Sequence, residues 1–366
     1  MAENALNIEL SALEIDSLIT TGIGAKFYGT LEEPIIHILY EAAKSKIGGK
    51  SPSLYAAQRL IQEVKPKDIV LFLTGWTIRN WMEGETDGPP GCAALARALC
   101  VGLEAVPVVV TEDRLVEMVA GAFRGAGLHR YSLEEARRVP NRFAVIGIPT
   151  DRSSHEGEAL ARNLLNEIAP SAVIAVEKAG PNEKGICHSA RGEDITALNI
   201  RADVLINEAR KKGILTISCG DLGNEIGMGL IEDTVRRVVP YGERCNCPCE
   251  SGLTCNIPTD IVIPAFVSNW GAYGIEACLA LLLNQVEVMH DGVIEDFIYT
   301  ECLRNNAICS PMGLSSFSQE TVDQLPGKVN RYVVELLNYM VSCRLFISKS
   351  KDKFSKDISK TSAALK

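Results

Sequence analysis

Short apolar runs that are rich in β-branched residues recur along the chain, and a segment of helical character follows each one. Alternation of buried strands with helices is typical of βαβ units around a mainly parallel sheet. The pattern therefore predicts a layered α/β fold, in which helices flank a mainly parallel β-sheet. The six predicted strands lie at residues 68–75, 105–111, 143–150, 171–177, 213–218 and 260–268.

The two ends of the chain have a different character. Residues 1–70 read as helices that pack over the sheet, and one of them ends at a Gly-Gly pair that suits a helix C-cap. Residues 328–346 have the pattern of a closing helix. We expect one α/β domain over residues 1–345 and a disordered basic tail at 346–366, where Lys and Ser dominate.

Charge and hydropathy exclude two classes of partner. The net charge of −9 argues against a nucleic-acid binder, which needs a concentrated basic face. Residues 261–283 resemble a membrane span in their apolar content, but Pro264, Asn269 and Glu276 interrupt them. This stretch is better read as a strand, a turn and an amphipathic helix, so no membrane contact is expected.

Cysteine usage bears on the compartment. The chain has 12 cysteines, and its acidic start lacks the pattern of a signal peptide. We therefore expect reduced thiols and a cytoplasmic protein. Self-association into a homo-oligomer is compatible with this composition.

Polar, Gly-rich loops follow four of the predicted strands. In an open parallel sheet the ligand crevice lies beyond the carboxyl ends of the strands, where loops and helix N-termini converge. The functional residues are therefore expected in these loops, which span residues 76–91, 178–196, 220–229 and 269–274.

The loop 220–229 carries the densest set of constraints. Its glycines, including Gly220 and Gly223, allow a ligand to approach the main chain closely. Asp221, Asn224 and Glu225 offer the hard oxygen atoms that Mg²⁺ or Mn²⁺ takes. A structural turn stays open as an alternative for this loop. Further candidate metal ligands in neighbouring loops are Glu85, Asp87 and Glu177, although Asp87 alone reads more readily as a helix N-cap.

The loop 178–196 contains several cations. Lys178 and Arg191 are candidates for holding a carboxylate or phosphate of a small anionic substrate. A solvated surface loop is an equally good interpretation of such a mixed charge run. In the last loop Asn269 is a candidate for binding substrate or for capping the helix that follows.

The cysteine string "CNCPCESGLTC" is a second candidate metal site. Four thiols close together suit zinc or an Fe–S cluster, but C-x-C-x-C is not the C-x₂-C pair of standard sites. Metal binding is therefore the less favoured interpretation of this string. Its thiols belong to Cys245, Cys247, Cys249 and Cys255.

Four motifs together resemble a known family. The segments "GETDGPPGCAALARAL", "VEKAGPNEKGICHSARGEDIT", "GDLGNEIGMG" and "SNWGAYGIEACLALL" are similar to segments that occur in this order in D-glutamate cyclase-like C-terminal domains. The resemblance covers about residues 20–290 and does not include the "CNCPC" string. It implies a lyase that interconverts D-glutamate and 5-oxo-D-proline, on a domain that stands alone in this chain.

The resemblance and the loop placement together suggest a mechanism. A divalent ion held by Asp221 and Glu225, with help from Glu85, Asp87 or Glu177, polarises a carboxylate oxygen or lowers the pKa of water. The substrate carboxylate is held by Lys178, Arg191 and the amides of the Gly-rich loop. Asp194 or His188 transfers the proton.

Three other functions stay open. A metal-dependent hydrolase or phosphatase acting on another small anion uses the same carboxylates. A non-catalytic sensor binds such an anion without turnover. A cysteine-centred metal or redox module rests on the "CNCPC" string alone.

Overall fold

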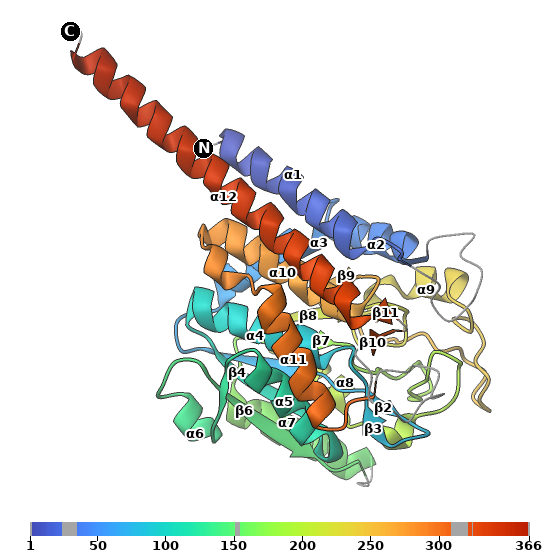
Figure 1. The fold of residues 1–366 in the computed structure, drawn as a ribbon. Helices are drawn as coiled ribbons and strands as arrows, with labels where there is room; N and C mark the ends of the chain where they lie inside the picture. Colours follow the sequence, from blue (N-terminus) through green and yellow to red (C-terminus); the bar gives the residue numbers. More distant parts are fainter. Residues whose placement is uncertain (1, 24–34, 151–153, 309–320, 324, 365–366) are drawn as a thin grey trace.

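A seven-stranded, entirely parallel sheet forms the centre of the molecule (Figure 1). The computed structural model describes residues 2–23, 35–150, 154–308, 321–323 and 325–364. The strand order is β5-β6-β4-β1-β7-β8-β9. The strands are β1 (Ile69–Leu73), β4 (Val106–Glu112), β5 (His129–Arg130), β6 (Arg142–Ile148), β7 (Ala172–Val176), β8 (Leu215–Gly220) and β9 (Ile261–Pro264).

The sheet is buried on both faces, and its strands β1 and β7 are apolar at every position. In β1, Val70 and Phe72 belong to one hydrophobic core, whereas Leu71 and Leu73 belong to the other. Successive side chains of a strand point to opposite faces, so a continuous apolar run feeds two cores. The predicted layered α/β fold is confirmed.

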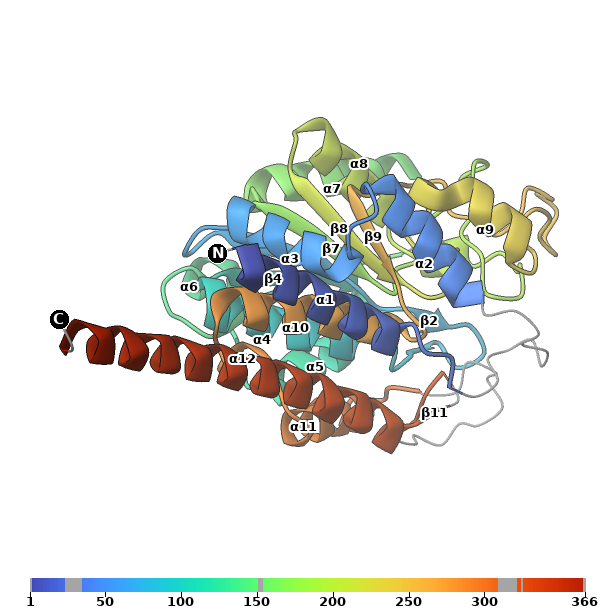
Figure 2. The same ribbon diagram turned by 90° about the horizontal axis from the view of Figure 1, so that it is seen from above.

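Helices cover the two faces unequally. Figure 2 shows the sheet between α7 and α8 on one side and α10 and α12 on the other. The face of Leu71 is covered by α2 (Ile35–Lys46), α6 (Leu133–Ala136), α7 (Ser154–Ile168), α8 (Ala202–Lys211) and α9 (Glu232–Val238). The face of Phe72 is covered by α1 (Ala2–Ile19), α3 (Pro52–Glu63), α4 (Pro89–Leu103), α5 (Val116–Gly125), α10 (Ser268–Leu283), α11 (Gly292–Arg304) and α12 (Gly327–Ala364).

The N-terminal segment is helical, as predicted, and the described part of the chain ends in α12; the disorder predicted for residues 346–366 stays a prediction. α12 continues to Ala364 and includes most of the stretch 346–366 that the sequence predicts to be disordered. No Gly or Pro follows Gly327 in the sequence, so no residue that stops a helix is present. Figure 1 shows α12 reaching well beyond the body of the molecule. Residues 365 and 366 lie outside the described part.

The stretch 261–283 forms a strand, a turn and a helix, but the helix is not amphipathic. Every residue of α10 from Ser268 to Leu281 is buried, because α3, α4 and α12 surround it. Among the described helices, none is both long and apolar enough to cross a membrane.

The chain changes direction across the sheet next to β1. From β1 the chain adds β4 and β6 on one side, and then it crosses to add β7, β8 and β9 on the other. Ligands of open α/β sheets bind at such a switch point, beyond the carboxyl ends of the strands. The loops after β1, β7 and β8 therefore converge where a site is expected.

Candidate active site

Three carboxylates meet at this carboxyl edge of the sheet. Asp87 precedes α4, Glu177 follows β7 and Asp221 follows β8. One oxygen of each lies within 4.8 Å of an oxygen of the other two, and Asp87 and Glu177 are buried. The structure thus brings together three of the five metal ligands predicted from separate loops.

Asp87, which precedes α4, binds the start of α10, and Asn269, which lies in α10, binds the start of α4. Asp87 Oδ2 accepts a hydrogen bond from the amide of Ser268 at 3.0 Å, and Oδ1 accepts one from the amide of Asn269 at 2.9 Å, at the start of α10. Asn269 Oδ1 accepts from the amides of Gly88 and Gly91 at 2.9 and 2.8 Å, at the start of α4. Two helix N-termini therefore face the carboxylates, and their dipoles stabilise negative charge there.

Glu177 is held in a strained position beside these helices. Its backbone φ angle is 45°, which lies in the left-handed region that residues other than glycine rarely adopt. Its Oε2 accepts a 2.5 Å hydrogen bond from the hydroxyl of Ser268. Gly88 has φ 101°, and a Cβ there would lie 3.0 Å from Glu177 Cβ and 2.6 Å from Thr74 Oγ1. The close approach of the loop to Glu177 therefore requires glycine at position 88.

Glu225 shapes the Gly-rich loop by binding its main chain. Its Oε1 accepts hydrogen bonds from the amides of Asp221 at 3.2 Å and Leu222 at 3.0 Å, and Oε2 accepts one from Gly223 at 2.6 Å. These three bonds fix the loop that presents Asp221. The predicted role of Glu225 as a metal ligand stays a prediction, since Glu225 is not among the three carboxylates that converge.

Like charges make the cluster electrostatically unfavourable. Burial raises the pKa of Glu177 well above its ordinary value, and the carboxylates of Asp221, Glu225, Asp87 and Glu85 raise it further. Burial also raises the pKa of Glu85, together with Asp323, Asp87 and Asp221. A site of this kind gains stability from a bound proton or cation.

The charge of Lys178 is already neutralised by Glu112. Its Nζ lies 2.5 and 2.7 Å from the two carboxylate oxygens of Glu112 and donates to the carbonyl of Gly75 at 3.0 Å. Glu112 also accepts a hydrogen bond from the amide of Ile200 at 3.0 Å. Both charged side chains are fully buried. The predicted contact of Lys178 with substrate stays a prediction.

Sequence reasoning missed Glu112. It is the last residue of the apolar strand β4, and an acidic residue at the carboxyl end of a buried strand is itself a signal. The pair joins the ends of β4 and β7 to the turn after β1, so it holds in place the main chain next to Glu177.

Comparison with known proteins identifies the group to which this fold and site belong. The family model described as "D-glutamate cyclase-like, C-terminal" matches residues 43–338. The chain belongs to this family. It is also 30% identical over 206 residues to the protein named D-glutamate cyclase, mitochondrial, from Homo sapiens. The match covers 55% of this chain, and the chain spans 30% of the length of that relative.

Two further predicted residues of this D-glutamate cyclase-like chain lie on its surface. Asp194 is exposed, and its Oδ1 accepts a hydrogen bond from the amide of Thr196 in the following turn. Arg191 is also exposed, and its carbonyl accepts a hydrogen bond from Asn246. Neither belongs to the carboxylate cluster, and their predicted roles stay predictions.

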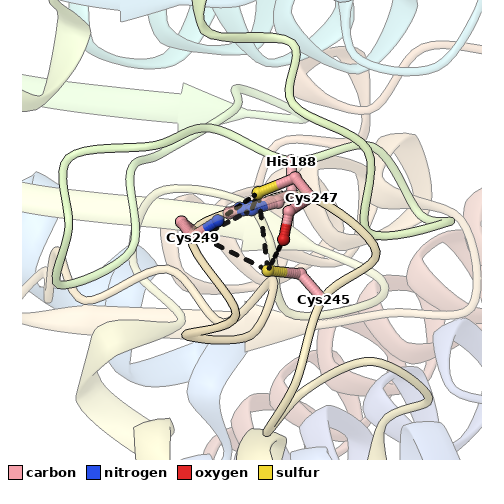
Figure 3. A group of neighbouring side chains, drawn as sticks. All are labelled: His188, Cys245, Cys247 and Cys249. Atoms are coloured by element: carbon pink, nitrogen blue, oxygen red, sulfur yellow. Dashed lines mark hydrogen bonds between the residues drawn. The ribbon is translucent and has the colours of Figure 1, made fainter.

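His188 lies among cysteines instead of carboxylates. Figure 3 shows its ring facing Cys245, Cys247 and Cys249, and these four residues form a second group of potential metal ligands. Cys255, which the sequence grouped with them, is not part of this group, and its sulfur accepts a hydrogen bond from the amide of Ile257. The cysteine spacing alone could not show that a distant histidine completes the set.

Asn224 connects the two groups. It lies in the loop of Asp221, and its Nδ2 donates a 2.8 Å hydrogen bond to the carbonyl of His188. The main-chain carbonyl of Asn224 accepts a hydrogen bond from the amide of Gly180 at 2.9 Å. Asn224 therefore ties the loop 220–229 to the segment that leads from Glu177 to His188.

Proposed function

We propose that the chain interconverts D-glutamate and 5-oxo-D-proline, as a lyase that removes or adds water. The observation that carries the proposal is the convergence of Asp87, Glu177 and Asp221 at the switch point of the sheet. Membership of the D-glutamate cyclase-like family supports the choice of substrate. The named activity of the human relative supports it as well.

The three carboxylates would hold a divalent cation, with Mg²⁺ or Mn²⁺ as the candidates. Carboxylate oxygens are the donors that these hard ions prefer. Burial and then the neighbouring carboxylates raise the pKa of Glu177, and a cation would offset both effects. When bound, such an ion polarises a carboxylate or carbonyl oxygen and stabilises negative charge on it.

The protein's own residues then have to move protons and place the substrate. In cyclisation the nitrogen of the α-ammonium group bonds to the γ-carboxylate carbon, and one oxygen leaves that carbon. The nitrogen loses two protons, and the leaving oxygen takes them up to become water. We assign the transfer of these protons to Glu85, because burial and the carboxylates of Asp323 and Asp87 raise its pKa and so favour its protonated form. Opening of the lactam reverses these steps with the same group.

The test is NMR of the purified chain incubated with D-glutamate, L-glutamate and both enantiomers of 5-oxoproline. The protein is first treated with a chelator and then given Mg²⁺ or Mn²⁺. We expect cation-dependent conversion of the D pair only. Asp221→Asn should reduce the rate by roughly 100-fold or more, as is usual when a group that stabilises developing charge is lost. Asp233→Asn, at an exposed acidic residue of α9, is the matched control and should keep full activity.

Each other result points elsewhere. Turnover of a different small anion with the same dependence on Asp221 would make the chain a hydrolase or phosphatase and overturn the cyclase assignment. Binding of D-glutamate without turnover would make it a sensor. Full cyclase activity in Asp221→Asn would remove the carboxylate cluster from the mechanism. The cytoplasmic location and the homo-oligomer predicted from the sequence stay predictions.

A further inference from the structure

Three thiols and one imidazole form a compact cluster that has no role in the proposed reaction. His188 Nε2 lies 3.2 Å from Cys247 Sγ and 3.5 Å from Cys249 Sγ. Cys245 Sγ lies 3.6 Å from Cys247 Sγ and 3.3 Å from Cys249 Sγ. The dashed lines in Figure 3 trace these contacts, which come from two segments far apart in the sequence. All four potential ligand atoms lie within 4.8 Å of one another.

These separations are close to those of a tetrahedral zinc site. Zinc binds cysteine sulfur at about 2.3 Å and histidine nitrogen at about 2.0–2.1 Å, so ligand atoms at the corners of a tetrahedron are separated by about 3.5–3.8 Å. The observed distances of 3.2 to 3.6 Å require only a small expansion. Each residue offers one ligand atom to the cluster.

We propose that His188, Cys245, Cys247 and Cys249 bind one zinc ion in a closed, structural site. Three thiolates and one imidazole fill the four positions that zinc takes and leave none for substrate. The main chain and a neighbouring side chain already donate hydrogen bonds to two of the sulfurs. The amide of Cys249 donates to Cys247 Sγ at 3.4 Å, and Asn182 Nδ2 donates to Cys249 Sγ at 3.4 Å. Such contacts orient and stabilise thiolate ligands.

Burial is consistent with a bound ion. The side chains of His188, Cys245 and Cys247 are buried, and Cys249 is only partly exposed. Soft thiolate ligands select zinc over the hard cations that suit the carboxylate cluster. The two clusters would therefore take different metals.

The zinc ion would link two segments that are hydrogen-bonded to each other near the loops of the candidate active site. His188 belongs to the segment that begins at Glu177, and the cysteines belong to the segment 241–258. These segments already contact each other, because the amide of Asn246 donates to the carbonyl of Gly192 at 3.0 Å. The second segment also reaches the loop of Asp221, where the amide of Cys255 donates to Gly223 at 2.9 Å. Binding of zinc would thus hold both loops around the carboxylates.

Two other fates of these thiols fit the geometry less well. An Fe–S cluster places its own iron and sulfide atoms between the ligands, whereas these four ligand atoms lie within 4.8 Å of one another, which suits a single ion. A disulfide would use two of the thiols and leave the third beside a buried imidazole without a function. The cysteines of the cluster are free thiols in this structure.

The experiment measures metal in the full chain and does not depend on turnover. The purified protein is analysed for zinc and iron by mass spectrometry, and the same protein is then reconstituted with Co²⁺. We expect close to one zinc per chain and an intense sulfur-to-cobalt charge-transfer band, because thiolates coordinate the ion. Cys247→Ser and His188→Gln should reduce zinc content several-fold and weaken or abolish the band.

Matched variants separate this site from other thiols and from the carboxylates. Cys343→Ser, on α12, and Cys255→Ala, in the same segment as the cluster, should both retain zinc. Asp221→Asn should also retain zinc even if it abolishes turnover, so failure of the proposed function leaves this inference intact. Because the cobalt spectrum of the unaltered chain is informative by itself, misfolding of a variant does not remove the test.

Three results would overturn the proposal. One is iron with acid-labile sulfide in place of zinc. Another is metal-free protein with a disulfide between Cys245 and Cys249. The third is zinc that survives both ligand substitutions and gives a cobalt complex without a sulfur band, which would place the ion on carboxylates.

Discussion

Removing the charge of Glu112 should destabilise the protein far more than removing a charge from its surface. Glu112 binds the buried ammonium of Lys178 with both oxygens, and in Glu112→Gln the carbonyl of Gly75 and one amide oxygen remain as partners. The substitution keeps the shape of the side chain and an acceptor for the amide of Ile200. The loss of stability therefore reports mainly the unpaired charge.

The magnitude follows from burial. Lys178 and Glu112 have 0% and 1% of their side-chain surfaces exposed. Leaving one member of such a pair uncompensated costs about 3–5 kcal/mol, out of a total stability of about 5–15 kcal/mol for a typical domain. By contrast, Arg59 and Glu63 form a pair at 3.2 Å with 29% and 47% exposed, and Glu63→Gln should cost less than about 1 kcal/mol.

The assay is equilibrium unfolding in urea at neutral pH, followed by circular dichroism, for Glu112→Gln, Lys178→Met, Glu63→Gln and the double variant that combines Glu112→Gln with Lys178→Met. Because neutral groups then replace both charges, the double variant should recover much of the loss. The reasoning is refuted if Glu112→Gln costs no more than Glu63→Gln, or if the double variant is less stable than the sum of the single changes.

Two further predictions concern the helices beside the site. Burial alone would lower the pKa of His290, but its ion pairs with Glu276 at 2.7 Å and Glu295 at 3.1 Å outweigh that effect and raise the pKa from 6.5 to about 10. The free energy of unfolding that these ion pairs contribute is fully present below pH 6.5 and is lost as the pH rises toward 10. Urea unfolding should therefore show that stability declines over this pH range, and that His290→Gln makes the decline shallower. An equally steep decline in the variant would contradict this prediction. Asn269→Ala removes the acceptor of the Gly91 amide at the start of α4, whereas the Gly88 amide still donates to Asp87 Oδ1 at 2.9 Å. Unfolding should therefore show a loss of about 1–3 kcal/mol for the unpaired Gly91 amide. A loss below about 0.5 kcal/mol, as at an ordinary surface position, would argue against this capping role.

The alternation of apolar runs was enough to predict six of the strands, because a parallel sheet buried on both faces needs continuous β-branched sequence. The strand β5 (His129–Arg130) was missed, since it is two residues long and both are exposed. The order of strands could not be read from the sequence, because it depends on which faces the connecting helices cover. Even so, loops that follow parallel strands share one edge, which is why Asp87, Glu177 and Asp221 could be grouped before their positions were known.

It was easier to predict which polar side chains lie in the loops than to predict which partner each side chain contacts. Glu225, Lys178 and His188 all lie in the predicted loops, yet the main chain binds Glu225, Glu112 binds Lys178, and three thiols surround His188. Sequence spacing shows which donors a loop carries, but only the folded chain shows which neutralising partners are already present. Asp221 is the first residue to mutate because of its position: its carboxylate lies close to the buried carboxylates of Asp87 and Glu177. Glu225, by contrast, binds the main chain of the loop that carries Asp221.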